Sequence, residues 1–203
     1  AQHPEKNETK QMNVRVFHIV LLILITLQVN AQITTSGKGK RMDARQKEQI
    51  AIDDQLATQY YRDQEYDKAR DIYKQLYEKT ERTNYFQQLV ECHIQLKEYD
   101  KAEKELKSYL KKNPNYAKSL ADLVYVYTLQ GKPDKAKKQF NEITKDLPDN
   151  APTIRNLSYA FQNRGLNDMA MSVLEKGNAA LNGKESLYMD MAYLNQSMAN
   201  YQE

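Results

Sequence analysis

The chain has 203 residues, of which 40% are hydrophobic and 28% charged. This balance excludes a protein embedded throughout in a membrane, and it is too apolar for a disordered chain. The formal net charge of +3 is too small to indicate a polyanionic partner. Six glycines and five prolines favour long runs of regular structure, and a single cysteine, Cys92, excludes an internal disulfide.

The first part of the chain has the layout of a secretory signal peptide. Met12 is followed by Arg15, by an apolar run over residues 16–27, and by Val29-Asn30-Ala31. The run is shorter than the roughly 20 residues that a membrane-spanning helix needs. We therefore expect cleavage after Ala31 and a periplasmic or secreted protein without membrane insertion, with an uncleaved inner-membrane anchor as the minor alternative.

The junction before Gln32 resembles export signals that are common in Bacteroidota. Residues 1–31 are then upstream sequence and signal peptide, which are removed. Residues 32–44 carry turn-forming and basic residues without periodicity, so we expect a flexible leader there.

The remainder of the chain repeats with a period of about 34 residues. Tyr66-Asp67-Lys68-Ala69 recurs as Tyr99-Asp100-Lys101-Ala102 and then as Pro133-Asp134-Lys135-Ala136. Successive alanines of the series Ala69, Ala102, Ala136 and Ala170 are 33, 34 and 34 residues apart, and Pro114 and Pro148 are also 34 apart. Such self-similarity indicates stacked supersecondary units.

These repeats resemble the tetratricopeptide repeat (TPR) family. The alanines fall at the twentieth position, where only a small side chain fits between two helices, and Pro114 and Pro148 fall at the terminal proline position. The resemblance implies an all-α, right-handed solenoid of helix-turn-helix units over residues 45–203. The expected repeats are 50–82, 83–116, 117–150, 151–184 and a truncated unit, 185–203.

The sequence offers no plausible catalytic, metal or cofactor site. Cys92 and His93 are adjacent, but both fall at packed positions of the repeat, and adjacent helical residues point about 100° apart. Phosphate-binding loops and four-ligand zinc patterns are absent from the sequence. We therefore expect a protein that is not an enzyme and has no cofactor.

Lysines are frequent in two of the expected second helices, for example Lys101, Lys104, Lys135 and Lys137. Acidic residues lie between them, and a nucleic-acid patch would lack this interleaving. A solvated outer face is the better interpretation, and no nucleic-acid partner is expected.

In the TPR family, particular positions of each first helix line a concave groove that holds partner segments. Tyr125, Tyr159 and Tyr193 occupy the ninth position of three successive repeats. Lys118, Arg155, Gln87 and Gln162 fall at neighbouring groove positions. These seven residues are the candidate site for a protein or peptide partner, although the tyrosines could equally pack against neighbouring helices and seal the superhelix.

Two interpretations of function remain open at this point. The first is a non-catalytic protein-interaction scaffold of the cell envelope. The alternative is an N-terminal sensory or interaction array of a larger membrane regulator or enzyme, truncated after residue 203. It is suggested by the last repeat, which stops after its first helix.

Overall fold

A computed structural model describes residues 42–200, and these residues contain α-helices and no strand. The chain divides into two compact units, Ala1–Gln49 and Ile50–Glu203, and the features below belong to the second. The helices are α2 (Ala44–Arg62), α3 (Tyr66–Thr80), α4 (Thr83–Gln95), α5 (Tyr99–Lys112), α6 (Ala117–Leu129), α7 (Pro133–Thr144), α8 (Ala151–Gln162), α9 (Asn167–Ala180) and α10 (Tyr188–Asn200). The predicted all-α fold is confirmed. The predicted signal peptide, its cleavage after Ala31 and most of the leader lie outside the described residues.

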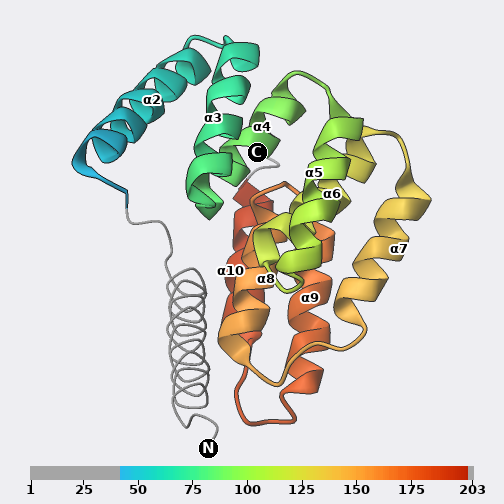
Figure 1. Cartoon of the computed structure of the whole chain (residues 1–203). Helices are drawn as coiled ribbons and strands as arrows, with labels where there is room; N and C mark the ends of the chain where they lie inside the picture. Colours follow the sequence, from blue (N-terminus) through green and yellow to red (C-terminus); the bar gives the residue numbers. More distant parts are fainter. Residues whose placement is uncertain (1–41, 201–203) are drawn as a thin grey trace, which may run out of the picture. The chain divides into compact units, whose positions relative to one another are not determined.

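The helices follow the repeat in pairs. The helices α4, α6 and α8 begin at Thr83, Ala117 and Ala151, the residues at which repeats were expected to start, and α5, α7 and α9 follow them as second helices. Figure 1 shows α8 and α9 side by side, and α6 packs against both its own partner α7 and the next first helix, α8. Each hairpin therefore covers its apolar face with the next one.

The turn within each hairpin needs one residue with a left-handed backbone. This residue is Gln64, Lys97, Gly131 and Gly165 in successive repeats, with φ of 62°, 57°, 67° and 68°. Glycine adopts this conformation without strain, whereas Gln64 and Lys97 adopt it at some cost.

The repeat alanines lie where two helices cross. Ala69, Ala102 and Ala170 are fully buried and Ala136 is 3% exposed. In the fourth repeat Gly177 extends the close approach, because a Cβ placed on it would lie 2.3 Å from Cγ2 of the buried Ile154. Small side chains at these positions therefore set the distance between the paired helices. The two repeat prolines, Pro114 and Pro148, are exposed in the loops before α6 and α8.

The first and last described helices expose residues that the inner repeats bury. Leu89 is 2% exposed and Tyr85 stacks on Tyr73 of α3, with ring centroids 6.4 Å apart. The equivalent residues of α2, Leu56 and Ile52, are 43% and 51% exposed, because the described residues include no earlier second helix to cover them. Tyr188 of α10, the counterpart of the buried Phe86, is likewise 68% exposed.

A carboxylate in the α4–α5 turn joins the first two repeats. Glu98 accepts hydrogen bonds from Nδ1 of His93 at 2.7 Å, from Nη1 of Arg70 on α3 at 3.2 Å and from Nζ of Lys101. Burial alone would raise the pKa of Glu98, but these three donors outweigh it and lower the pKa to about 2. Glu98 therefore stabilises the fold in its ionised form.

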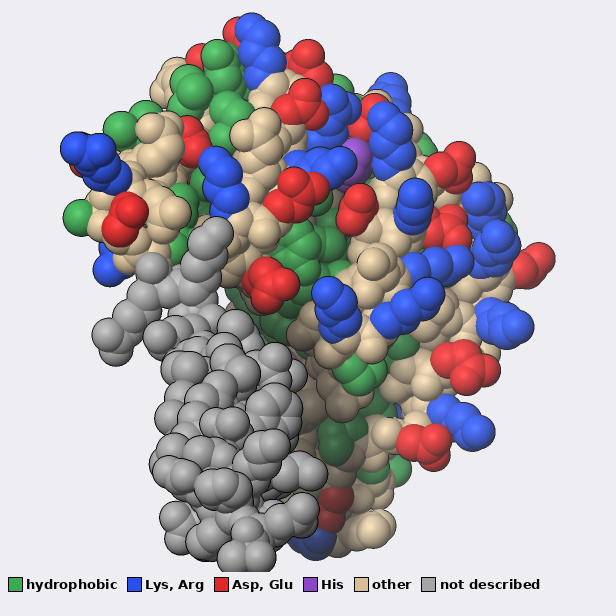
Figure 2. All heavy atoms as spheres, viewed as in Figure 1, with side chains coloured by type: hydrophobic (Ala, Val, Ile, Leu, Met, Phe, Trp, Pro, Cys, Tyr) green, Lys and Arg blue, Asp and Glu red, His purple; other side chains and the backbone are tan. Residues whose placement is uncertain are grey.

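The outer face that α5 and α7 present carries basic and acidic side chains in alternation (Figure 2). Several of the lysines there are paired, such as Lys107 with Glu103 at 2.6 Å. This arrangement is that of a solvated helical surface.

We expect the Glu98→Gln variant to lose stability at neutral pH and to match the unsubstituted chain in strong acid. The pKa of Glu98 in the folded chain, about 2, lies below the ordinary glutamate value of 4.5. Its contribution is therefore fully present above about pH 4.5 and is lost as the pH falls towards 2. Because Glu98 is partly solvated, we expect a difference on the order of 1 kcal/mol at pH 7. Urea unfolding at pH 7, 4 and 2.5 measures it, and a difference that stays constant over this range would contradict the assignment.

Candidate functional site

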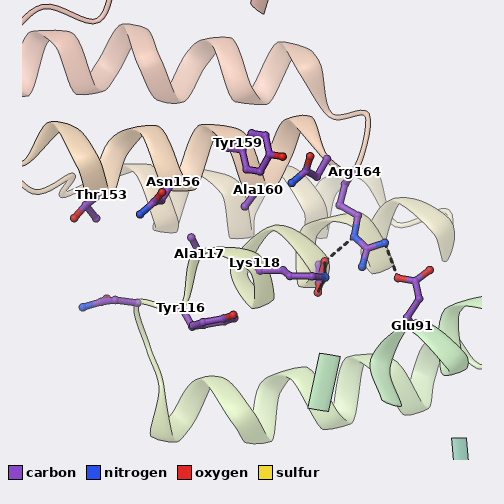
Figure 3. A pocket seen from close by; sticks show the side chains of 12 residues that line it. Glu91, Tyr116, Ala117, Lys118, Thr153, Asn156, Tyr159, Ala160 and Arg164 are labelled. Carbon is purple, nitrogen blue, oxygen red and sulfur yellow. Dashed lines mark hydrogen bonds and ion pairs between the residues drawn. The ribbon is translucent and has the colours of Figure 1, made fainter. Parts of the chain in front are cut away.

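Three hollows adjoin along α8. The first, with a volume of about 650 Å³, lies between α6, α8 and the loop before α6. The others, of about 330 and 480 Å³, extend toward α10 and toward the α8–α9 turn. Tyr159 lines all three, so they form one continuous depression, which we call the α8 groove. In Figure 3, Thr153, Asn156 and Tyr159 follow one another along α8, Arg164 lies just beyond the end of this helix, and Ala117 and Lys118 lie on the opposite side of the first hollow.

The three predicted tyrosines do not share one environment. Tyr159 and Tyr193 are 63% and 66% exposed and line the groove. Tyr125 is half-buried, and the guanidinium of Arg164 lies over its ring, 5.2 Å from the centroid. The structure thus brings two of the tyrosines together in the groove and uses the third as support for Arg164.

The two predicted cations line the groove, and each is already paired. Nζ of Lys118 lies 3.1 Å from Oδ2 of Asp122. Nε of Arg155 donates to both carboxylate oxygens of Asp190 on α10, at 3.1 and 3.0 Å. Arg155 also lies 3.6 Å from Glu185. Their charges are therefore largely compensated within the chain.

The two predicted glutamines also have partners. Nε2 of Gln162 donates to Oγ of Ser197 on α10 at 3.1 Å, at the edge of the groove. Gln87 does not line the groove directly. Its Nε2 donates to the hydroxyl of Tyr116 at 2.6 Å, and Tyr116 lines the first hollow.

The central feature of the site was not predicted. Arg164, in the turn after α8, reaches back to two earlier repeats: its Nε lies 2.6 Å from Oδ1 of Asp122 on α6, and its Nη1 lies 2.8 Å from Oε2 of Glu91 on α4 (Figure 3). The side chain of Arg164 is 13% exposed and that of Asp122 only 2%. We call these three residues the Arg164 cluster.

The charges of the cluster stabilise one another. Burial alone would raise the pKa of Glu91, but the nearby charge of Arg164 and hydrogen bonds from Gln95 and Arg164 outweigh it and lower that pKa. For Arg164, burial alone would lower the pKa, and the charges and hydrogen bonds of Asp122 and Glu91 raise it instead. Glu91 and Arg164 are thus both ionised at neutral pH.

One signal in the sequence could have indicated the cluster. Asp122 is the only acidic residue of α6, and its neighbours in the helix are Ala121 and Leu123. A lone carboxylate in an apolar stretch needs a buried partner. The sequence gives no indication that this partner is Arg164, 42 residues further on.

Cys92 and His93 lie in the core. Cys92 is fully buried, and burial raises the pKa of its thiol to about 12, so the thiol stays protonated at neutral pH. His93 is 6% exposed and bonded to Glu98. Within residues 42–200, no group of His, Cys, Asp and Glu side chains has an arrangement that could hold a metal ion. Over the same residues, no helix has both the length and the apolar character that crossing a membrane requires.

Residues 22–163 match the family described as the coatomer epsilon subunit. The chain belongs to this family. The match covers more than half of the chain and includes the helices α2 to α8. Together with the paired helices, it confirms the expected repeat type in its general form: the chain is a TPR-like repeat protein. No curated protein is significantly similar to it in sequence.

Solved structures with a similar arrangement include MamA, with 20% identity over 66% of this chain and 80% of that chain, at a TM-score of 0.41. A thermophilic TPR protein in Thermus thermophilus has 17% identity over 73% and 82%, at 0.41. A protein from Podospora anserina with nearly identical TPR-like repeats has 16% identity over 91% of this chain and 99% of that chain, at a TM-score of 0.43. Because these TM-scores are below 0.5, the fold is assigned from the helices of this chain and not from its similarity to these structures.

In this member of the coatomer epsilon subunit family, we expect Arg164→Gln to destabilise the fold by about 3 kcal/mol, because it leaves the buried carboxylate of Asp122 with Lys118 alone. Arg155→Gln is the matched control, since its ion pairs are partly solvated and its loss should cost less than about 1 kcal/mol. Urea unfolding followed by circular dichroism compares the two. Equal losses would mean that the Arg164 cluster has no special role in stability.

Proposed function

We propose that this chain is a non-catalytic protein-interaction scaffold of the cell envelope, which binds a partner segment in the α8 groove. The observation that carries the proposal is the position of Tyr159, 63% exposed where the three hollows meet. A large aromatic ring in the middle of a continuous depression is typical of a residue that a partner covers.

The packing of the other tyrosines supports this use of the groove. The alternative to recognition is that the tyrosines pack against the chain and seal the superhelix. Tyr125 packs in this way, because Arg164 covers its ring. Tyr159 and Tyr193 do not, since both are more than 60% exposed. Tyrosine provides a large contact area and a hydroxyl at a small cost in side-chain entropy, which suits recognition.

A protein is the partner class that fits best. The groove lies on rigid helices, and family membership adds that the relatives are named for a subunit of a larger complex. The non-catalytic role is supported by Cys92 and His93, which are buried in the core. The interleaved charges on α5 and α7 do not favour nucleic acid.

Export is the part of the proposal that rests on the sequence alone. We expect the mature chain to begin at Gln32 in the periplasmic or secreted fraction, because the small residues that end at Ala31 follow an apolar run too short to span a bilayer. N-terminal sequencing and intact mass of the fractionated protein measure this. Ala31→Arg is the control that should block cleavage. An unsubstituted chain that retains Met12 in the membrane fraction would contradict export by cleavage.

Recognition through Tyr159 has a direct test. We expect Tyr159→Ala to leave the melting temperature nearly unchanged, since the ring is mostly solvated, and to weaken partner binding by at least about 2 kcal/mol, as for an interface anchor. A photo-crosslinking phenylalanine analogue placed at position 159 in living cells should capture a defined protein.

The matched position for the crosslinker is Tyr188, which is exposed to a similar extent, 68%, and does not line the groove. The groove is excluded as the binding site if positions 159 and 188 capture the same proteins. It is excluded as well if Tyr159→Ala melts several degrees lower with unchanged capture, which would indicate a packing role.

A further inference from the structure

The α8 groove contains equal numbers of positive and negative side chains. Among the described residues that line its three hollows, the charged ones are Lys118, Arg155, Arg164, Glu91, Asp122 and Asp190. Each is held by another member of this set. Lys118 and Arg164 bind Asp122, Arg164 also binds Glu91, and Arg155 binds Asp190. The groove therefore presents three cations and three anions with no charge left over.

A charged ligand gains little from such a surface. Nη2 of Arg164 has no hydrogen-bond partner in the part of the chain that the structure describes, but it is buried, so that a partner carboxylate would have to displace Asp122 to reach Arg164. Asp122 is only 2% exposed and would itself lose its compensation. A partner ammonium group would meet carboxylates that are already neutralised. The ion pairs thus disfavour the binding of charged partner segments and do not affect the binding of uncharged ones.

Uncharged hydrogen-bonding groups remain available in the groove. Asn156 and Asn163 line the first hollow, and their side-chain amides are exposed. Neither amide bonds to any residue of the part of the chain that the structure describes. Each offers two donor hydrogens and an acceptor oxygen, the combination that pairs with both groups of a peptide bond.

The spacing of the two amides suits an extended main chain. Asn156 lies in α8, and Asn163, which caps the end of α8 with helical backbone angles, follows seven residues later. Seven residues are close to two helical turns, so both lie on one side of the helix at a distance of about 10.5 Å along its axis. Three residues of an extended chain with polyproline II geometry rise about 9 Å and complete one turn, so that peptide groups three residues apart face the same way. An extended segment of this kind lying along α8 would therefore present a peptide group to each amide in turn.

We propose that the α8 groove selects an extended, uncharged segment of polypeptide, whose main chain is bound by Asn156 and Asn163 and whose side chains lie against Tyr159. This proposal rests on the function proposed above and adds the chemistry of the partner. Selection comes from two features: main-chain hydrogen bonds that any sequence can form, and an inner set of ion pairs that gives charged side chains nothing to bind. Binding is consequently insensitive to salt.

The test is a selection from a displayed library of random 12-residue peptides against the intact chain, with counter-selection against Tyr159→Ala. Selected peptides are then synthesised, and their affinities are measured at 50 and 500 mM NaCl. We expect peptides of net charge between about −1 and +1, with affinities that change less than about two-fold with salt, since no net charge is screened. Asn156→Ala combined with Asn163→Ala should weaken binding about ten-fold, as expected for two lost neutral hydrogen bonds.

The matched control is Asn141→Ala, which removes an exposed asparagine from α7, outside the groove, and should leave binding unchanged. Strongly acidic or basic peptides that still depend on Tyr159 would overturn the selection of uncharged segments and leave the groove as a protein-binding site. If no selected peptide depends on Tyr159, both proposals fail. They also fail if a panel of neutral oligosaccharides binds in a Tyr159-dependent manner and peptides do not.

Discussion

The ion pairs of Arg164 with Asp122 and Glu91 connect three repeats that would otherwise interact only in succession. In a repeat protein each unit contacts its immediate neighbours, so distant units are related only through those between them. Arg164 lies in the α8–α9 turn of the fourth repeat and reaches α6 of the third and α4 of the second. The relative positions of these three repeats thus depend on one side chain as well as on the apolar contacts between successive helices. Through Arg164, the turn after α8 is thus connected directly to α6, the other helix that lines the first hollow.

The same cluster gives the groove its electrostatic character. A carboxylate as buried as Asp122 requires a partner with good hydrogen-bond geometry, and loss of that partner is strongly destabilising because it leaves a buried charge uncompensated. The partner is Arg164, which lines the groove. Asp122 therefore compensates the charge of Arg164 and part of the charge of Lys118. What remains for a ligand is a surface of tyrosine rings and amides. Stability and ligand preference therefore have a common physical origin in this molecule.

Local periodicity was enough to predict the helices, because each repeat alanine and each helix start depends on nearby residues. Thr83, Ala117 and Ala151 begin helices where the period indicated. The groove positions of Lys118, Arg155 and Tyr159 followed from the same register. Their ionic partners did not, because contacts such as Arg164 with Glu91 join residues of different repeats and obey no period. The repeat register predicted the same role for Tyr125 and Tyr159, and only the position of Arg164 distinguishes the two.

The turn that carries Arg164 explains how a residue outside the groove positions enters the groove. Gly165 follows it with φ of 68°, and nothing lies within 4 Å of the place where its Cβ would be. Glycine is therefore needed there for its backbone conformation and not for space. The corresponding turns of the first two repeats use Gln64 and Lys97 in the same left-handed conformation, and neither residue lines the α8 groove. Glycine occupies this position in the third repeat, as Gly131, as well as in the fourth. The turn from which Arg164 reaches the groove therefore adopts its left-handed backbone without strain, because Gly165 directly follows Arg164.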